Sequence, residues 1–360
     1  MPRICITDLN GHSTSSRPIG VFAWMMQLED KKLRLIHLLL ISAAIYLIYT
    51  DIMEANTSSK LQKIHLIFRY GNLISKILWI VTLRSKRWQY TELVDLFENQ
   101  TRCILGNERV YRHSTKVRRI FVPLCIMFVV QTIFISVFYR PIMILYGTND
   151  YFHFGKSLTF GLLRAVFICI YPLYTQLIIE CCLHIHACWL TVDKQICLLK
   201  NIDRRALTID KIREVRSMYS IAAVITEKMD SFLRFPIAIF FGFYIMANFI
   251  FFVQFWTELS LNKLIRFVWR CTVLALVISN MIYIHYLSHK SFDGVYALSY
   301  GKHPLQVNNE IHLFLDRIGQ SNVGFSFLKI SLITPTFVTS LASATLTFVL
   351  SLPSLIEESI

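Results

Sequence analysis

Hydroxyl side chains recur along the last apolar stretch of the chain at helical spacing. The row consists of Thr336, Ser340, Ser343, Thr347 and Ser351. Steps of three or four positions place these residues on one face of an α-helix. Such a face can meet water while the opposite apolar face packs on protein, and symmetric copies of the helix can then enclose a pore. Hydroxyl groups also suit dry helix packing or hydrogen bonding to their own backbone, so the spacing leaves both uses open.

Pro335 stands at the near end of this row. A proline inside a helix removes one backbone hydrogen bond and bends the axis. If the helix occupies the whole apolar stretch 328–352, we expect a kink at Pro335 that either serves as a hinge or is merely tolerated.

Basic and aromatic side chains inside other apolar stretches form a second group of interest. Arg69, Arg164 and Arg270 each lie five or six positions from the predicted outer end of a stretch. Because charge is costly in lipid, each arginine either lines an outward-open pocket or extends to the headgroups. Phe243 and Tyr244 belong to an aromatic segment able to contact an apolar ligand. We take these five residues as the candidate ligand pocket.

Catalytic and metal-binding patterns are weak by comparison. Cys181, His184 and Cys188 share a helical face at a spacing that metal ligands use, but no clear fourth ligand accompanies them. The sequence contains no nucleophile elbow, phosphate loop, HExxH motif or paired catalytic carboxylates. We expect no enzyme activity, no cofactor and no metal.

Seven long apolar segments position these residues. The chain has 360 residues, 54% apolar content and a mean hydropathy of +0.50, values typical of a polytopic membrane protein. The predicted spans are 33–49, 64–83, 120–139, 158–183, 237–255, 265–286 and 328–352. We therefore predict an all-α fold with seven transmembrane helices at 33–352, after a cytoplasmic segment at 1–32 and before a tail at 353–360.

The basic residues predict the orientation. Of the 37 Lys and Arg, 25 lie in the N-terminal segment and every second loop after it, and 5 lie in the opposite loops. Since cytoplasmic loops retain Lys and Arg during insertion, the N-terminus is predicted inside the cell and the C-terminus outside. The net charge of +14 is then explained by topology and by attraction to inner-leaflet membrane lipid, so we expect no nucleic-acid partner.

The loops on the two sides differ in length. Outer loops are short, so a ligand must enter between the helices; one of them carries Asn56 in a sequon, a candidate glycosylation site. Inner loops at 84–119, 184–236 and 288–327 contain little Gly or Pro and are predicted to continue as cytoplasmic helices.

Two inner segments carry apolar stripes at helical spacing. The first stripe consists of Ile212, Val215, Met218, Ala222, Ile225, Met229 and Phe232. The second belongs to a shorter helix predicted to start at Asn308 or Asn309 as N-cap and to end at Gly319. Such stripes need partners, and periodicity leaves packing within one subunit and packing between subunits equally open.

The sequence resembles the insect gustatory receptor family, and the end of the chain carries the resemblance. The matching features are the 310–318 helix, the approach Gly324-Phe325-Ser326-Phe327-Leu328 and the closing apolar stretch. The family pattern there is Thr-Tyr, five apolar residues and Gln-Phe. The aligned residues here are Thr347-Phe348, then Val349, Leu350, Ser351, Leu352 and Pro353, then Ser354-Leu355. Thr347 matches, whereas Ser354 replaces the Gln and Pro353 departs from the pattern.

This resemblance implies a ligand-gated cation channel of the plasma membrane of sensory neurons, assembled as a homo- or heterotetramer and opened by a tastant or contact pheromone. It also implies that the final helix lines the pore and that the ligand pocket opens outward among the second to sixth spans. Two alternatives are a G-protein-coupled receptor and a solute transporter. The charge bias opposes the first alternative, because its N-terminus would be outside.

Overall fold

A computed structural model gives the structure of the chain. It describes residues 30–55, 107–139, 151–202, 207–257, 261–301, 303–320 and 323–357, together with Met25 and separate positions between 70 and 100. The long helices are α2 (Asp30–Ala55), α4 (Glu108–Ile133), α6 (Tyr151–Asn201), α7 (Ile209–Thr257), α8 (Leu261–Ser299) and α10 (Pro335–Glu357). A π-helical turn η1 (Phe134–Tyr139) extends α4, and α9 (Leu305–Gly319) is shorter.

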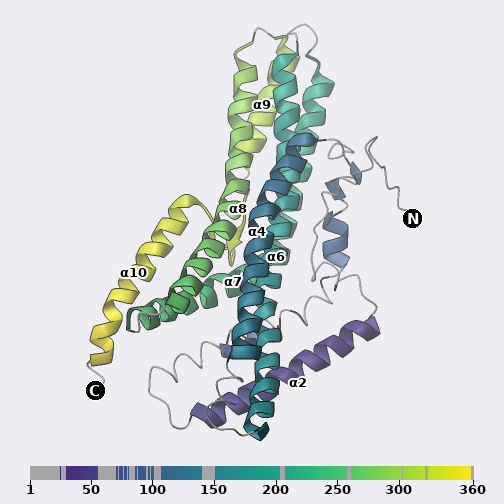
Figure 1. Ribbon diagram of the computed structural model, residues 1–360. Coiled ribbons are helices and arrows are strands. Elements are labelled where there is room, and N and C mark those ends of the chain that lie inside the picture. The colour runs from purple at the N-terminus through teal and green to yellow at the C-terminus, as the bar shows by residue number, and fades with distance from the viewer. Residues whose placement is uncertain are drawn as a thin grey trace.

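The described part of the chain is helical apart from one antiparallel hairpin of β1 (Ser326–Phe327) and β2 (Ser331–Leu332). The all-α prediction is therefore confirmed for these residues. Figure 1 shows α6, α7, α8 and α9 side by side in one upright bundle with α4 along it, while α10 diverges from the bundle. The predicted span at 64–83 lies largely outside the described residues. The number of membrane crossings and the orientation of the chain stay predictions.

Helix α6 forms the centre of the bundle. Every residue from 177 to 193 is buried, including Trp189. A helix that is buried all round must be surrounded by other helices, and α4, α7 and α8 provide that surround. At the close approach of α6 and α8, a Cβ on Gly294 would lie 2.7 Å from Cγ2 of Ile196, so glycine is required at this crossing.

Helices α6 to α9 cover most of the segments 184–236 and 288–327 and pack against one another within the chain, while the cytoplasmic location of these segments stays a prediction. All seven residues of the α7 stripe are buried. Phe314 of α9 is fully buried and meets Tyr219 of α7 edge to face, with ring centroids 5.6 Å apart. The structure thus gives both stripes partners in the same chain.

The predicted start of α9 was wrong by several residues. The helix begins at Leu305, so Asn308 and Asn309 lie inside it. The carbonyl oxygen of Pro304 accepts hydrogen bonds from the backbone N–H groups of Val307 and Asn308, both at 3.0 Å. A proline just before the first turn can therefore start the helix without an Asn side chain as cap. The predicted end at Gly319 is confirmed.

Buried carboxylates join the inner helices through ion pairs. Glu180 of α6 accepts two hydrogen bonds from Arg118 of α4, at 3.0 and 2.6 Å. Asp193 of α6 accepts from Arg109 of α4 at 2.8 Å and from Lys290 of α8 at 3.2 Å. A buried carboxylate that lost such a partner would cost roughly 3–5 kcal/mol, so these pairs constrain how α4 and α8 sit on α6.

A third carboxylate, Glu310, pairs α9 with α7. It lies within 3.3 Å of Arg213 and 2.8 Å of Arg216, and only 5% of its side chain is exposed. The contact between α7 and α9 is therefore held by charge as well as by apolar packing.

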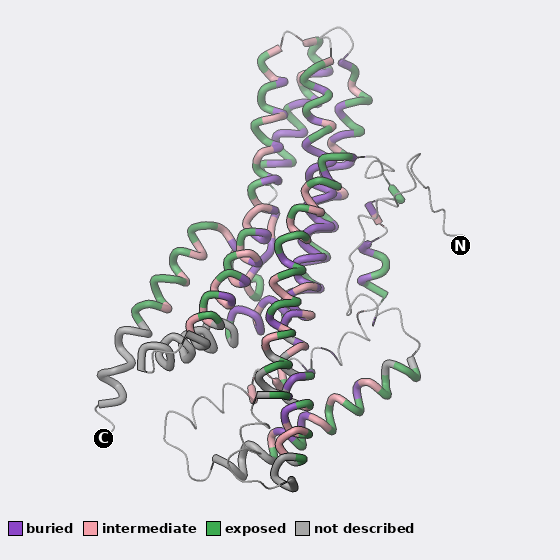
Figure 2. The backbone as a smooth tube through the Cα atoms, viewed as in Figure 1, coloured by how far each residue is buried: buried purple, intermediate pink, exposed green. Residues whose placement is uncertain are grey.

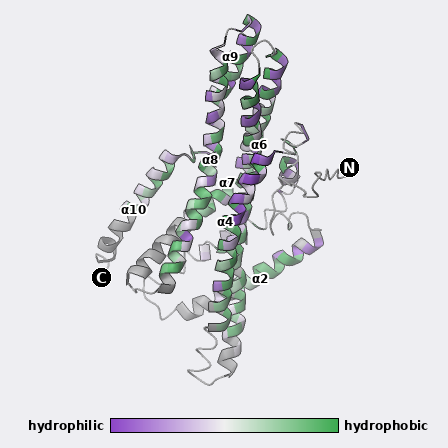
Figure 3. Ribbon diagram, turned by 45° about the horizontal axis from the view of Figure 1, so that its top comes forward, coloured by the Kyte–Doolittle hydropathy of each residue, from purple (hydrophilic) through white to green (hydrophobic). Residues whose placement is uncertain are grey.

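The surface changes character along the molecule. In the bundle of α6, α7, α8 and α9 most buried side chains are apolar, the exceptions including the paired Glu180, Asp193 and Glu310 (Figures 2 and 3). Farther along α4 and on α2, large apolar side chains are exposed instead: Leu38, Leu39, Ile45, Met127, Val130 and Phe134. An exposed apolar surface of this extent is unusual for a protein surrounded by water and is typical of contact with lipid or with another chain.

Two described segments, Pro172–Asn201 and Phe267–Ser299, are long and apolar enough to cross a membrane. The first is almost wholly buried, so packing against neighbouring helices also explains its composition. The exposed apolar faces of α2 and α4 are therefore the more direct argument for a membrane.

Candidate functional site

The hydroxyl-bearing helix begins at Pro335 and is not bent there. The preceding Thr334 acts as N-cap, because its Oγ1 accepts a hydrogen bond of 3.2 Å from the backbone N–H of Phe337. Proline is favoured in the first turn because its missing N–H would have no helical partner there. The predicted kink at Pro335 was wrong, and so was the predicted start of the helix at residue 328.

The hydroxyl row lies on the face of α10 away from the rest of the chain. Thr336, Ser340, Ser343 and Thr347 are exposed, and Ser351 lies in the helix with its side chain outside the described part. The opposite face carries Phe337, Val338 and Leu341, which pack partly buried against the core. The structure therefore confirms that the hydroxyl groups share one face. Their contact with a pore stays a prediction.

Several hydroxyl groups on this helix already donate their proton to a backbone carbonyl oxygen of the same helix. Oγ1 of Thr347 donates to the carbonyl oxygen of Ser343 at 3.0 Å, and Oγ1 of Thr339 donates to that of Thr336 at 2.9 Å. A hydroxyl whose proton bonds the backbone can offer only its lone pairs to an outside group. The exposed threonine oxygen of Thr347 is thus suited to a cation or to the hydrogens of water.

A short hairpin attaches the base of α10 to the bundle. Phe325 and Ile333, one before β1 and one after β2, are fully buried, and the N–H of Ile333 donates to the carbonyl of Phe325 at 2.8 Å. Between the strands, Leu328 and Lys329 have φ angles of 52° and 62°. Residues with a side chain are strained in this left-handed region. The surrounding structure therefore holds Leu328 and Lys329, in the turn before α10, in a backbone conformation that these residues disfavour.

A buried carboxylate fixes the hairpin to α7. Oδ1 of Asp230 accepts the backbone N–H of Ser326 at 2.7 Å, and Oδ2 accepts the Ser326 hydroxyl at 2.6 Å. Burial raises the pKa of Asp230 above its usual value of 3.8, although the two Ser326 hydrogen bonds and the nearby Arg234 and Lys329 oppose this rise. We call this pair of bonds the Asp230–Ser326 tie.

Aromatic packing supports the same junction. The ring of Phe241 on α7 meets Phe327 of β1 and Phe337 of α10 nearly edge to face, with centroids 6.1 and 6.3 Å apart. Phe327 and Phe337 are 5.9 Å apart. Three elements therefore converge where α10 leaves the bundle, and the rest of α10 extends beyond this point (Figure 1).

The residues predicted to form a ligand pocket are not brought together by the described part of the structure. Arg270 lies half-buried on α8. Arg164 lies on α6, and Phe243 and Tyr244 lie on α7, with their side chains outside the description; Arg69 also lies outside it. The glycosylation candidate Asn56 likewise lies outside the described residues. The pocket and the sequon both stay predictions.

Sequence reasoning missed the Asp230–Ser326 tie and the pairing of Glu180 with Arg118. Lys76 in the second predicted span needs a polar partner, for which Glu180 or a backbone carbonyl are candidates by sequence, but Lys76 lies outside the described residues. The sequence feature that pointed to a buried ion pair was the carboxylate of Glu180 in an otherwise apolar helical segment. Its partner could not be identified, because Arg118 lies 62 positions away on another helix.

The described residues offer no group of three His, Cys, Asp or Glu arranged to hold a metal ion. Cys181, His184 and Cys188 are instead buried in the centre of the bundle. His186 has a protein partner on each ring nitrogen, since it lies 3.1 Å from His113 Nε2 and 2.9 Å from the carbonyl oxygen of Asn280.

No family model and no curated protein sequence matches the chain. Solved structures do match it. The insect olfactory receptor OR5 from Machilis hrabei has 14% sequence identity, a TM-score of 0.59, and 87% coverage of both chains. The same receptor in complex with eugenol has 13% identity, a TM-score of 0.59 and 88% coverage of both chains. The chain thus has the fold of this insect olfactory receptor over most of its length.

Proposed function

We propose that this chain is a chemoreceptor subunit that forms a ligand-gated cation channel. Four subunits surround a central pore, each contributing α10, with the N-terminus in the cytoplasm and the C-terminus outside the cell. The likeness to an insect olfactory receptor supports the architecture. The resemblance of residues 310–355 to gustatory receptors supports a tastant or contact pheromone as ligand and the plasma membrane as location.

The exposed hydroxyl face of α10 is the observation that carries this proposal. Within the described part of one chain this face is exposed, although the helix is apolar and diverges from the bundle. An apolar helix that is packed on only one side needs further contacts in lipid or between subunits. Copies of α10 around an axis provide these contacts and leave the hydroxyl row for water and ions.

Ligand binding acts through the equilibrium between closed and open channels. A small molecule that binds between the outer helices more tightly in the open state shifts the population toward that state. We place this pocket among Arg69, Arg164, Arg270, Phe243 and Tyr244. That the related fold has been solved with eugenol supports a small, largely apolar ligand.

The pore assignment is tested by adding apolar bulk to the hydroxyl row. Ser343→Leu and Thr347→Leu are expressed in cells that lack other receptors, and ligand-evoked current is compared with surface expression. We expect both variants to reduce or abolish current at unchanged surface expression. Ala342→Leu is the matched control, since it adds similar bulk at an exposed position about 100° around the helix from Ser343. Equal currents in all three variants would remove α10 from the pore.

The orientation is tested by epitope tags on each terminus of intact cells. We expect a tag after Ile360 to be labelled without permeabilisation and a tag before Met1 to be labelled only after it. The reverse pattern would contradict the channel proposal and favour a G-protein-coupled receptor. Accumulation of substrate against a gradient without single-channel steps would favour a transporter.

A further inference from the structure

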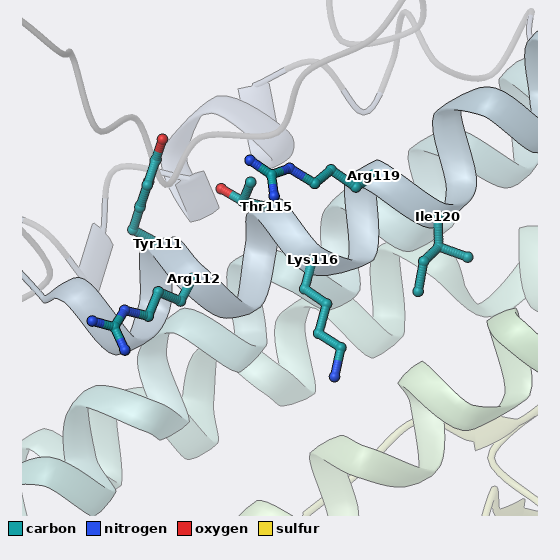
Figure 4. A pocket seen from close by; sticks show the side chains of 6 residues that line it. All are labelled: Tyr111, Arg112, Thr115, Lys116, Arg119 and Ile120. Carbon is teal, nitrogen blue, oxygen red and sulfur yellow. The ribbon is translucent and has the colours of Figure 1, made fainter.

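A basic groove runs along the exposed face of α4. It has a volume of about 440 Å³ and is lined by Tyr111, Arg112, Thr115, Lys116, Arg119 and Ile120 (Figure 4). Successive residues in the rows 111, 115, 119 and 112, 116, 120 are four apart, so they lie one above another on the helix surface. The lining carries three cations and two hydroxyl groups and no carboxylate.

The cations of this groove differ from the other basic residues of α4. Arg109 and Arg118 are committed to buried carboxylates of α6. Within the described part of the chain, by contrast, no carboxylate pairs with Lys116 or Arg119. Arg112 pairs with Glu108 one turn earlier, but both side chains are more than 70% exposed, and such surface pairs contribute little. The groove therefore has positive charge available for an outside anion.

The position of the groove identifies the source of that anion. Continuing along the face of Lys116, the exposed residues include Ile120, Pro123, Met127, Val130 and Phe134, all apolar. At 1.5 Å per residue, the apolar part from Ile120 to Phe134 extends for roughly 20 Å, more than the thickness of one leaflet. A soluble phosphate would use only the basic part. A lipid would use both parts, with its headgroup on the cations and its acyl chains on the apolar face.

We propose that this groove binds a phosphorylated inner-leaflet phospholipid, with the headgroup phosphates on Arg112, Lys116 and Arg119. The guanidinium groups can each bind two phosphate oxygens, Lys116 adds a point charge, and the hydroxyls of Tyr111 and Thr115 can donate further hydrogen bonds. Three cations on two adjacent turns match a headgroup with several negative charges better than one with a single charge. The proposal rests on the membrane placement of α4 given above and is independent of channel activity.

The experiment uses the full-length protein purified in detergent and a fluorescent short-chain phosphatidylinositol bisphosphate as probe. We expect saturable binding of the probe. The double variant Lys116→Gln/Arg119→Gln should raise the dissociation constant roughly thirtyfold, since each cation near a lipid headgroup contributes about 1 kcal/mol. The control Lys194→Gln/Lys200→Gln removes the same charge from exposed positions of α6. We expect it to bind within about twofold of the unaltered protein.

Two competitors and one apolar variant separate the sources of phosphate. Short-chain phosphatidylcholine is expected not to compete, and soluble inositol trisphosphate is expected to compete at least tenfold more weakly than the lipid. Met127→Ser should weaken binding of the lipid without changing binding of the trisphosphate. Lack of saturable binding, equal losses in both charge variants, or equal competition by the soluble headgroup would each overturn the proposal. Because no current is measured, these results do not depend on whether α10 lines a pore.

Discussion

Helices α6 and α10 are both long and apolar, but their surroundings are opposite. From 177 to 193, α6 exposes no residue, and its two carboxylates, Glu180 and Asp193, are paired inside the bundle. Helix α10 exposes most of its described side chains, among them Leu346 at 59%. The first helix has all its packing partners in its own chain. Among the described residues, the second is attached through the hairpin and the core contacts of its first turns.

This difference separates stability of the subunit from assembly of the channel. The buried bundle provides the packing that a folded subunit needs, whereas α10 contributes little to it once its first turns are attached. Changes at buried positions of α6, α7 or α9 should therefore destabilise the subunit, and changes at exposed positions beyond Leu341 of α10 should spare the subunit and alter the assembled state.

The largest expected effect is the truncation of Phe314. Phe314→Ala removes a fully buried ring that packs on Tyr219 and should cost roughly 3–5 kcal/mol, measured as a lower melting temperature of the purified protein. The matched change in α10 is Leu346→Ala, which we expect to alter stability by about 0.5 kcal/mol or less while weakening association of subunits in native mass spectrometry. Similar melting temperatures for the two variants would erase the distinction between the helices.

The Asp230–Ser326 tie comes next, because it is the polar link between the two regions. Asp230→Ala leaves the N–H and hydroxyl of Ser326 buried without these acceptors, at a cost of about 1–3 kcal/mol. Amide hydrogen exchange over residues 326–334 should become faster. Asp230→Asn should stay near the unaltered protein, since its oxygen accepts the N–H and its amide donates to the Ser326 oxygen. Exchange that is unchanged in the alanine variant would argue against a role for the tie.

A smaller effect is expected in the turn of the hairpin. Lys329→Gly relieves the positive φ of 62° and should stabilise the protein by about 0.5–1 kcal/mol, after the greater flexibility of unfolded glycine is deducted. The control is Ser331→Gly in the extended strand β2, which should destabilise by a similar amount. If both glycine variants shift the melting temperature in the same direction, strain in the turn is not the cause.

The smallest expected effect is a pH dependence centred on His113, where α4 meets α6 and α8. Burial lowers its pKa below the ordinary 6.5, and the charges of Lys116 and Arg109 lower it further. The neutral ring is thus favoured by the fold: its contribution to stability is fully present above pH 6.5 and is lost as pH falls through the folded-state pKa. His113→Gln should flatten the melting temperature between pH 7 and pH 5. A profile identical to that of the unaltered protein would assign the pH dependence to other groups.

Periodicity predicted the faces of the helices well. The α7 stripe and the hydroxyl row of α10 were both predicted from spacings of three and four, because a helix repeats about every 3.6 residues whatever it packs against. Helix starts were less predictable, as Pro335 and Asn308 show. A proline fits the first turn of a helix and bends the interior, and the sequence alone does not distinguish the two positions.

The contacts that join α10 to the bundle were beyond sequence reasoning for another reason. Asp230 and Ser326 are 96 positions apart, so no spacing rule relates them. The basic groove of α4 lay within a stretch of charge that topology alone had explained.

The ion pairs of the inner bundle also set an order of events during synthesis. Glu180 pairs with a residue 62 positions earlier, Asp193 with residues 84 positions earlier and 97 later, and Glu310 with one 97 positions earlier. Because synthesis runs from the N-terminus, Arg213 and Arg216 of α7 are made about 95 residues before Glu310 of α9. Until α9 is made, Arg213 and Arg216 lack this carboxylate, so the contact between α7 and α9 is completed only in the last sixth of synthesis.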